Sequence, residues 1–240
     1  MVVPAPVWCA VVPEGSNDPM TRLEIRARIE EIGIIPAIRV STAEDALFAA
    51  EAVSESAIPI VEVTMTVPGA VEVIRELTRH HPGVLVGAGT LYRVETARRC
   101  LDAGAVFLTM PGLDLEIVNF ALGRDVVVFP GALTPTEVMA AWKTGSDFVK
   151  VFPCFANGGP RYIQALKGPF SEVPLIASGG VTQMNAMDFI RAGAVALGIG
   201  RDLIHQDAIR RRERGWITEL ARRYRKMVAE ARSIQKEVGS

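Results

Sequence analysis

The chain has few residues of the kinds that form disulfides or hold metals. Its 240 residues include three cysteines, Cys9, Cys100 and Cys154, which lie far apart. An odd number of distant cysteines predicts neither a disulfide framework nor a zinc site, and it is typical of a reducing cytoplasm. Of the three histidines, two are adjacent and one is distant, so none has a partner at metal-ligand spacing. We therefore expect a cytoplasmic protein without a metal centre.

The chain also lacks a large net charge and long apolar runs. Its formal net charge of -1 gives no electrostatic reason to expect nucleic acid or anionic membrane as a partner. No apolar run reaches the length of a membrane span. Residues 1–20 lack the basic segment of a signal peptide, and two interpretations stay open for this N-terminal extension: a disordered segment, or a stretch that precedes the natural start.

What the chain does contain is apolar residues, enough for one large core. Hydrophobic residues make up 49% of the sequence, and no composition break or long linker divides it. A chain of this length suits one barrel or α/β fold better than two small domains. We therefore expect residues 21–240 to form a single domain.

Short apolar runs alternate with helical patterns from Thr21 onward. Thr21 and Glu24 have capping-box spacing and predict a helix that ends at about Ile32. Runs rich in Val and Ile predict eight strands, at residues 34–39, 58–64, 84–88, 106–109, 126–129, 147–153, 175–177 and 195–199. Helices are predicted at 41–54, 68–80, 93–103, 114–122, 134–144, 161–166 and 183–192, with one or two more closing the chain. The repeat predicts an α/β fold, a single (β/α)8 TIM barrel with an N-terminal helix and a C-terminal helical extension, and an open doubly wound sheet is the alternative.

One predicted strand, Asp147–Pro153, carries a lysine within an apolar run. Alternation along a strand places Lys150 on the same face as Phe148 and Phe152. Burial removes water from an ammonium group and so favours the neutral amine, which is a nucleophile toward carbonyl carbon. The alternative is a lysine at a strand end that extends to solvent.

A second charged residue, Glu62, lies in the apolar strand 58–64. It shares a face with Thr64, and a carboxylate inside a barrel needs a partner, for which Lys150 is the obvious candidate. A purely structural ion pair is the alternative, but buried pairs add little net stability. The pair therefore favours a catalytic interpretation.

Glycine-rich segments follow three of the predicted strands. Gly87–Thr90 offers a hydroxyl and helix N-terminal amides to a carboxylate, with a tight turn as the alternative. Ser178–Gly180 and Gly198–Arg201 end the last two strands, where barrels of this kind commonly bind phosphate. Arg201 adds a cation there, and ordinary glycine turns are the alternative.

These segments together resemble the class I 2-keto-3-deoxy-6-phosphogluconate (KDPG) and 4-hydroxy-2-oxoglutarate (KHG) aldolases. The resemblance covers about Thr21 to Leu203, and many motifs occur in the same order. They are Glu62–Thr64, Val86–Thr90, Pro111–Leu113, Pro130–Gly131, Thr134–Glu137, Lys150–Pro153, Gly168–Phe170 and Gly179–Gly180. The resemblance implies a trimeric barrel enzyme without metal or cofactor that cleaves a 2-oxo-3-deoxy sugar acid. KDPG would give pyruvate and glyceraldehyde 3-phosphate, a step of the Entner-Doudoroff pathway, and KHG would give pyruvate and glyoxylate.

The resemblance also implies a role for each site residue. Lys150 would form the Schiff base and Glu62 would move protons. The remaining positions would bind the substrate: Thr90, Gly89 and Arg39 its carboxylate, Pro111 and Phe152 the pyruvyl group, and Ser178, Gly179, Gly180, Gly200 and Arg201 the distal phosphate.

The chain departs from the family pattern at three places, one of which is Ser178, where the family often has threonine before the paired glycines. Some members carry an arginine where this chain has Thr66, and Arg39 fits a second version of the pattern. The phosphate loop often has a small polar residue where this chain has Arg201 and Asp202, and Asp202 would repel an anion if it faced the site. Two other hypotheses stay open: an isomerase or synthase in which Lys150 only binds charge, and a non-catalytic oligomeric scaffold.

Overall fold

The protein is described by a computed structural model that covers residues 20–56 and 58–238. The extension expected over residues 1–20 lies outside the described residues except for Met20, and so does Cys9. The first helix, α1 (Arg22–Ile32), begins at the predicted capping box, in which the Thr21 N–H donates to Glu24 Oε2 at 2.7 Å. It ends at Gly33, whose φ of 68° lies in the left-handed region that glycine adopts without strain.

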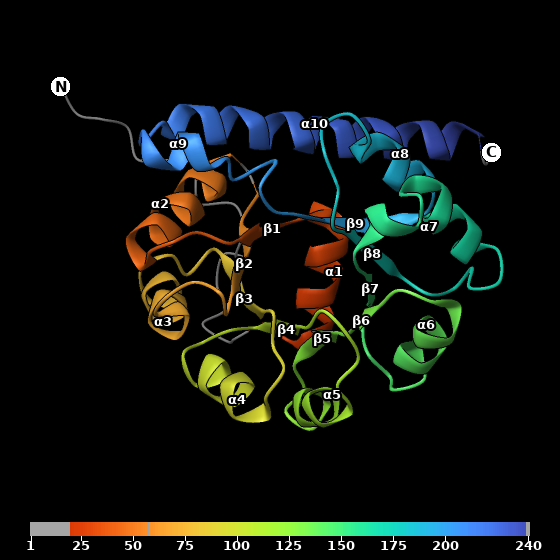
Figure 1. Cartoon of the computed structure of the whole chain (residues 1–240), viewed down its shortest axis with the longest axis horizontal. Helices are drawn as coiled ribbons and strands as arrows, with labels where there is room; N and C mark the ends of the chain where they lie inside the picture. The colour runs from red at the N-terminus through yellow and green to blue at the C-terminus, as the bar shows by residue number, and fades with distance from the viewer. Residues whose placement is uncertain (1–19, 57, 239–240) are drawn as a thin grey trace.

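The strands of the described residues are parallel and form one sheet that curves into a barrel (Figure 1). In chain order they are β1 (Ile34–Ile38), β2 (Ile60–Thr64), β3 (Leu85–Gly89), β4 (Phe107–Thr109), β5 (Val127–Phe129), β6 (Gly131–Ala132), β7 (Val149–Val151), β8 (Leu175–Ser178) and β9 (Ala194–Ile199). The predicted TIM barrel is confirmed, and the open doubly wound sheet is excluded.

A short strand that the sequence does not predict, β6, follows the fifth predicted strand after Pro130. Proline has no N–H to donate to a neighbouring strand, so the regular ladder is interrupted at this residue. β5 pairs with β4, through Thr109 and Phe129, and β6 pairs with β7, through Gly131 and Lys150. β5 is the strand predicted at residues 126–129, and β6 is a further strand at the opposite end of the sheet order.

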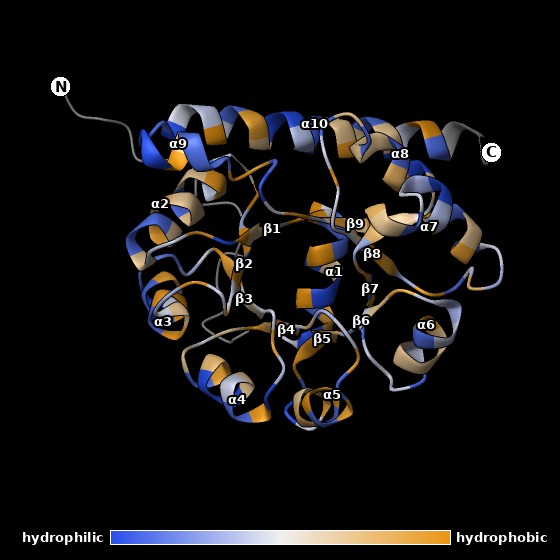
Figure 2. Ribbon diagram, viewed as in Figure 1, coloured by the Kyte–Doolittle hydropathy of each residue, from blue (hydrophilic) through white to orange (hydrophobic). Residues whose placement is uncertain are grey.

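A ring of helices covers the outside of the barrel. They are α2 (Ala43–Ser54), α3 (Ala70–His80), α4 (Val94–Asp102), α5 (Leu115–Leu122), α6 (Pro135–Trp142), α7 (Pro160–Lys167), α8 (Ala186–Arg191), α9 (Gln206–Arg210) and α10 (Arg214–Val238), and a 3-10 turn, η1 (Cys154–Asn157), follows β7. Figure 2 shows both hydrophobic and hydrophilic residues along each of these helices, as expected of elements with one face on the sheet. Within residues 20–56 and 58–238, no helix combines the length and the apolar character that crossing a membrane requires.

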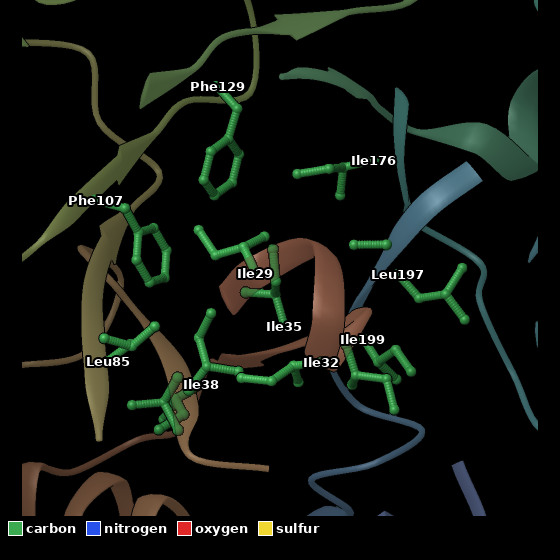
Figure 3. Packing of buried hydrophobic residues seen from close by; sticks show 14 of the residues in the cluster. Ile29, Ile32, Ile35, Ile38, Leu85, Phe107, Phe129, Ile176, Leu197 and Ile199 are labelled. Atoms are coloured by element: carbon green, nitrogen blue, oxygen red, sulfur yellow. The ribbon is translucent and has the colours of Figure 1, made fainter. Parts of the chain in front are cut away.

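Helix α1 closes one end of the barrel. Figure 3 shows Ile29 and Ile32 among strand side chains that include Phe107 and Phe129. Both isoleucines are almost fully buried. Arg22, at the start of α1, donates through Nε to Asp147 Oδ1 at 2.9 Å, and Asp147 precedes β7. The plug therefore lies at the amino ends of the strands and leaves the carboxyl ends open.

Arginine side chains of α10 cap the C-terminal end of α1 from outside the barrel. Arg232 donates to the carbonyls of Glu30, at 2.6 Å, and Glu31, at 2.8 Å. Arg225 donates to the carbonyl of Ile32 at 2.9 Å. The last carbonyls of a helix have no partner within the helix, and a cation there also complements the helix dipole. The C-terminal extension thus completes the first helix of the chain.

Candidate active site

The polar residues predicted from the sequence surround one cavity of about 710 Å³ at the carboxyl ends of the strands. The predicted residues that line it are Arg39, Glu62, Thr90, Pro111, Lys150, Phe152, Ser178, Gly179, Gly180, Gly200 and Arg201. Gly89 is the one predicted site residue that is not among the lining residues. The barrel therefore brings together side chains from β2, β7, β8 and the segments that follow β1, β3, β4 and β9.

Lys150 and Glu62 form an ion pair inside the barrel. Lys150 Nζ lies 3.4 Å from Glu62 Oε2, and the two side chains are 9% and 3% exposed. At this exposure Lys150 does not extend to solvent, and its ammonium group lies 5.8 Å from the centre of the Phe152 ring. The predicted partnership of strands β2 and β7 is thus present in the structure. An amine and a carboxylate placed side by side are what a nucleophile and its acid-base partner require.

The glycines of β3 make room for this pair. A Cβ atom on Gly89 would lie 1.9 Å from Glu62 Oε1, and one on Gly87 would lie 2.1 Å from the Phe107 ring. Glu62 therefore packs directly over the backbone of β3. The sequence predicts that a ligand approaches the segment Gly87–Thr90. In the structure, protein side chains occupy the space beside Gly87 and Gly89.

Thr90 follows β3 in an unusual backbone conformation. Its φ of 62° lies in the left-handed region, where a β-branched residue is rarely found. Such strain costs about 1 to 3 kcal/mol and is common where a side chain is held for binding. Thr90 and Arg39 both line the cavity that contains Lys150. A hydroxyl donor and an exposed guanidinium on this side are suitable partners for a substrate carboxylate.

Two loops form the side of the cavity that we call the distal side, residues 178–183 after β8 and residues 200–202 after β9. Gly179 and Gly180 both have φ of 82°, and a Cβ atom on Gly180 would lie 2.5 Å from Phe155 Cβ. Not every backbone amide of these loops is free for a ligand. The Thr182 N–H donates to Asn185 Oδ1 at 2.8 Å, and the Gln183 N–H donates to Asp202 Oδ2 at 3.3 Å.

Sequence reasoning missed two residues that shape the distal side. Phe155, on η1, lines the cavity and is 68% exposed. Tyr224 of α10 does not line the cavity, but its hydroxyl donates a hydrogen bond to Asp202 Oδ2. Burial, and then this bond, raise the pKa of Tyr224 above its ordinary value of about 10. The contact spans 22 residues of sequence, and no motif signals it.

A cysteine beside the site is inert by its surroundings. Cys154 is fully buried at the start of η1, and its Sγ donates to the Val151 carbonyl at 3.1 Å. Burial raises the pKa of this thiol to about 12. Because the thiolate is the reactive form, Cys154 is no competitor to Lys150 as a nucleophile.

Comparison with known proteins gives one consistent family. The model of the family described as KDPG and KHG aldolase matches residues 25–220. The KHG/KDPG aldolase of Escherichia coli is 33% identical over 189 residues, which cover 79% of this chain and 89% of that protein. The 2-dehydro-3-deoxy-phosphogluconate aldolase of Pseudomonas aeruginosa is 29% identical, over 84% of this chain and 92% of that protein.

Solved structures agree with these sequence relatives. A KDPG aldolase from Legionella pneumophila, with pyruvate captured at low pH as a covalent carbinolamine intermediate, has a TM-score of 0.77 to this chain. It is 29% identical, and the match covers 82% of this chain and 96% of that structure. Fold, sequence and relatives therefore lead to the same group of enzymes.

Proposed function

The chain belongs to the family of KDPG and KHG aldolases, and from this membership we propose that it is a class I aldolase whose Lys150 bonds covalently to the substrate. The observation that carries the proposal is the buried pair of Lys150 Nζ and Glu62 Oε2, 3.4 Å apart in an open cavity. Its substrate is a 2-oxo-3-deoxy acid of the KDPG or KHG type. Cleavage of either substrate gives pyruvate as one product.

The reaction begins with a proton shift inside the pair. When Lys150 gives one ammonium proton to Glu62, the amine becomes a nucleophile and no charge remains buried. The amine attacks the C2 ketone of the substrate and forms a carbinolamine. Glu62 returns the proton to the carbinolamine hydroxyl, which leaves as water, so that a protonated imine and the Glu62 carboxylate remain. The imine nitrogen then accepts electrons from the neighbouring carbon, which is the step that a metal-free aldolase needs.

Cleavage of the C3–C4 bond follows from that electron sink. Glu62, again as the carboxylate, takes the proton of the C4 hydroxyl, the aldehyde leaves, and the bonding electrons form an enamine on Lys150. Protonation of the enamine at C3 and hydrolysis of the imine release pyruvate and free Lys150. Thr90 and Arg39 hold the pyruvyl carboxylate, Pro111 and Phe152 enclose the pyruvyl group, and the distal side receives the rest of the substrate.

The test is to trap the imine by borohydride reduction in the presence of pyruvate. Mass spectrometry should find a reduced pyruvyl adduct on the peptide that contains Lys150, and Lys150→Ala should lose both the adduct and turnover. The exposed Lys143, which caps the C-terminus of α6, gives a matched control, because Lys143→Ala should form the adduct normally. An isomerase or synthase in which Lys150 only binds charge, or a non-catalytic scaffold, would give no adduct at Lys150.

Assembly and location complete the proposal. The family resemblance supports a homotrimer, and the sparse cysteines support a cytoplasmic enzyme of carbohydrate metabolism. Light scattering of the purified chain tests the first point, since a trimer has three times the 25.9 kDa mass of the chain.

A further inference from the structure

Asp202 places a carboxylate on the distal side of the cavity. A phosphorylated substrate would bring a second anion to the same place. Asp202 lines the cavity, and its side chain is partly buried. Two anions brought close together repel each other strongly unless hydrogen-bond donors or cations compensate the charge of one of them. The compensation in this structure comes from two protein donors.

Two donors hold one oxygen of Asp202. The Gln183 N–H reaches Asp202 Oδ2 from the loop after β8, and the Tyr224 hydroxyl reaches the same oxygen from α10. Two donors on one oxygen are the partners of an ionised carboxylate. Asp202 therefore links both distal loops to α10.

The surroundings of Tyr224 keep its hydroxyl a hydrogen-bond donor to Asp202. It is fully buried, it lies on a helix that runs along the outside of the barrel (Figure 1), and its raised pKa keeps the phenol protonated. It also lies beyond residues 25–220, the part of the chain that matches the family model. The contact is thus a feature that the C-terminal extension of this chain adds to the barrel.

We propose that Tyr224 is a positioning residue for the distal side, which holds Asp202 toward α10 so that an acceptor aldehyde with an anionic group can bind beside Arg201. The proposal rests on the aldolase function proposed above. Without the Tyr224 hydroxyl, Asp202 loses one of its two compensating donors and is free to turn toward the cavity. The charge of Asp202 then opposes an anionic acceptor, while an uncharged acceptor and the pyruvate half of the reaction are little affected.

The experiment measures aldol addition of pyruvate to two acceptors, D-glyceraldehyde 3-phosphate and D-glyceraldehyde, which differ only by the phosphate. The readout is the ratio of their kcat/KM values. Tyr224→Phe should lower the ratio about tenfold, mainly through KM of the phosphorylated acceptor. The double variant Tyr224→Phe/Asp202→Asn should restore the ratio, because the charge that opposed the phosphate is gone.

A matched control is Tyr162→Phe, since the Tyr162 hydroxyl also donates to a protein group, the Leu133 carbonyl, and Tyr162 does not line the cavity. This variant should leave the ratio unchanged. Exchange of the pyruvate methyl protons with deuterium, which needs only Lys150 chemistry, should proceed in Tyr224→Phe within about twofold of wild type. No exchange in the wild type would refute the proposed aldolase function itself, whereas normal exchange isolates the role of Tyr224.

An unchanged ratio in Tyr224→Phe overturns the positioning role. So does a lowered ratio that the double variant fails to restore, because the effect would then come from displaced loops and not from the charge. If Tyr224→Phe is too unstable to assay, Asp202→Asn alone replaces it. Because Tyr224 holds the carboxylate away from the acceptor in the wild type, removing the charge should change the ratio by less than about twofold, and a rise of about tenfold refutes the proposal.

Discussion

The two ends of the barrel use buried charges in opposite ways. At the closed end, Asp147 accepts hydrogen bonds from the Arg22 side chain and from the Val128 N–H, and buried apolar side chains of α1 fill the remaining space. At the open end, Lys150 and Glu62 form a single long contact of 3.4 Å beside an open cavity.

The difference teaches that burial alone does not identify a catalytic charge. Asp147 and Glu62 are both nearly inaccessible, at 4% and 2% exposure. The first has its hydrogen-bonding capacity met by protein donors, which is what a structural carboxylate requires. The second faces a lysine and a cavity, and so keeps capacity for a substrate.

The largest effect should follow from changing one carboxylate to an amide at the open end. Glu62→Gln removes the proton acceptor but keeps the shape of the side chain, so kcat should fall by about two to four orders of magnitude. Steady-state assays of pyruvate release measure this. A fall of less than about tenfold would mean that another group moves the proton.

The same chemical change at the closed end should affect stability and not turnover. Asp147→Asn weakens the contact with Arg22 and replaces an acceptor of the Val128 N–H, so the free energy of unfolding should fall by about 1 to 3 kcal/mol. Urea denaturation measures the loss, and kcat per folded enzyme should match wild type. A loss of kcat comparable to that of Glu62→Gln would remove the contrast between the two ends.

A smaller effect should come from relieving backbone strain at each end. Thr90 at the open end and Asp125 before β5 both have positive φ, at 62° and 54°. Glycine at either position should raise the free energy of unfolding by up to about 1 kcal/mol. Thr90→Gly should also raise KM for pyruvate, because it removes the hydroxyl, whereas Asp125→Gly should not. Equal kinetics in the two variants would show that Thr90 is strained without serving substrate binding.

The smallest effect concerns the dependence of stability on alkaline pH. The pKa of Tyr224 is raised above its unfolded value of about 10, so the folded protein keeps a proton that the unfolded chain loses. This stabilisation is complete below about pH 10 and declines as the pH rises. Urea denaturation at about pH 9 and 11 should therefore show a smaller loss of unfolding free energy in Tyr224→Phe than in wild type. An equal loss would mean that the phenol titrates normally.

Much of this architecture could be predicted from the sequence because it depends on local pattern. Apolar runs rich in Val and Ile predict the barrel strands except β6, and Lys150 and Glu62 are conspicuous as charges within such runs. β6 has only two residues, Gly131 and Ala132, and so has no apolar run to signal it. The helix predicted from Pro68 begins at Ala70, because the residues before it form a turn.

What the sequence did not predict depends on side chains that meet in three dimensions. No spacing of residues in the sequence signals three of these features: the room that Gly89 leaves for Glu62, the left-handed conformation of Thr90, and the hydrogen bond between Tyr224 and Asp202. Each arises from packing between elements, which sets side-chain neighbours only after the barrel has closed. The roles proposed for the site residues come from the resemblance to the aldolases, and their distances come from the structure.

The arginine caps on α1 bear on how the protein is synthesised. Arg232 and Glu31 are 201 residues apart in the chain, so the helix that closes the barrel leaves the ribosome long before the side chain that caps it. At about 5 to 20 residues per second, the interval is roughly 10 to 40 s. The closed end therefore reaches its final form only after Arg232 has been synthesised.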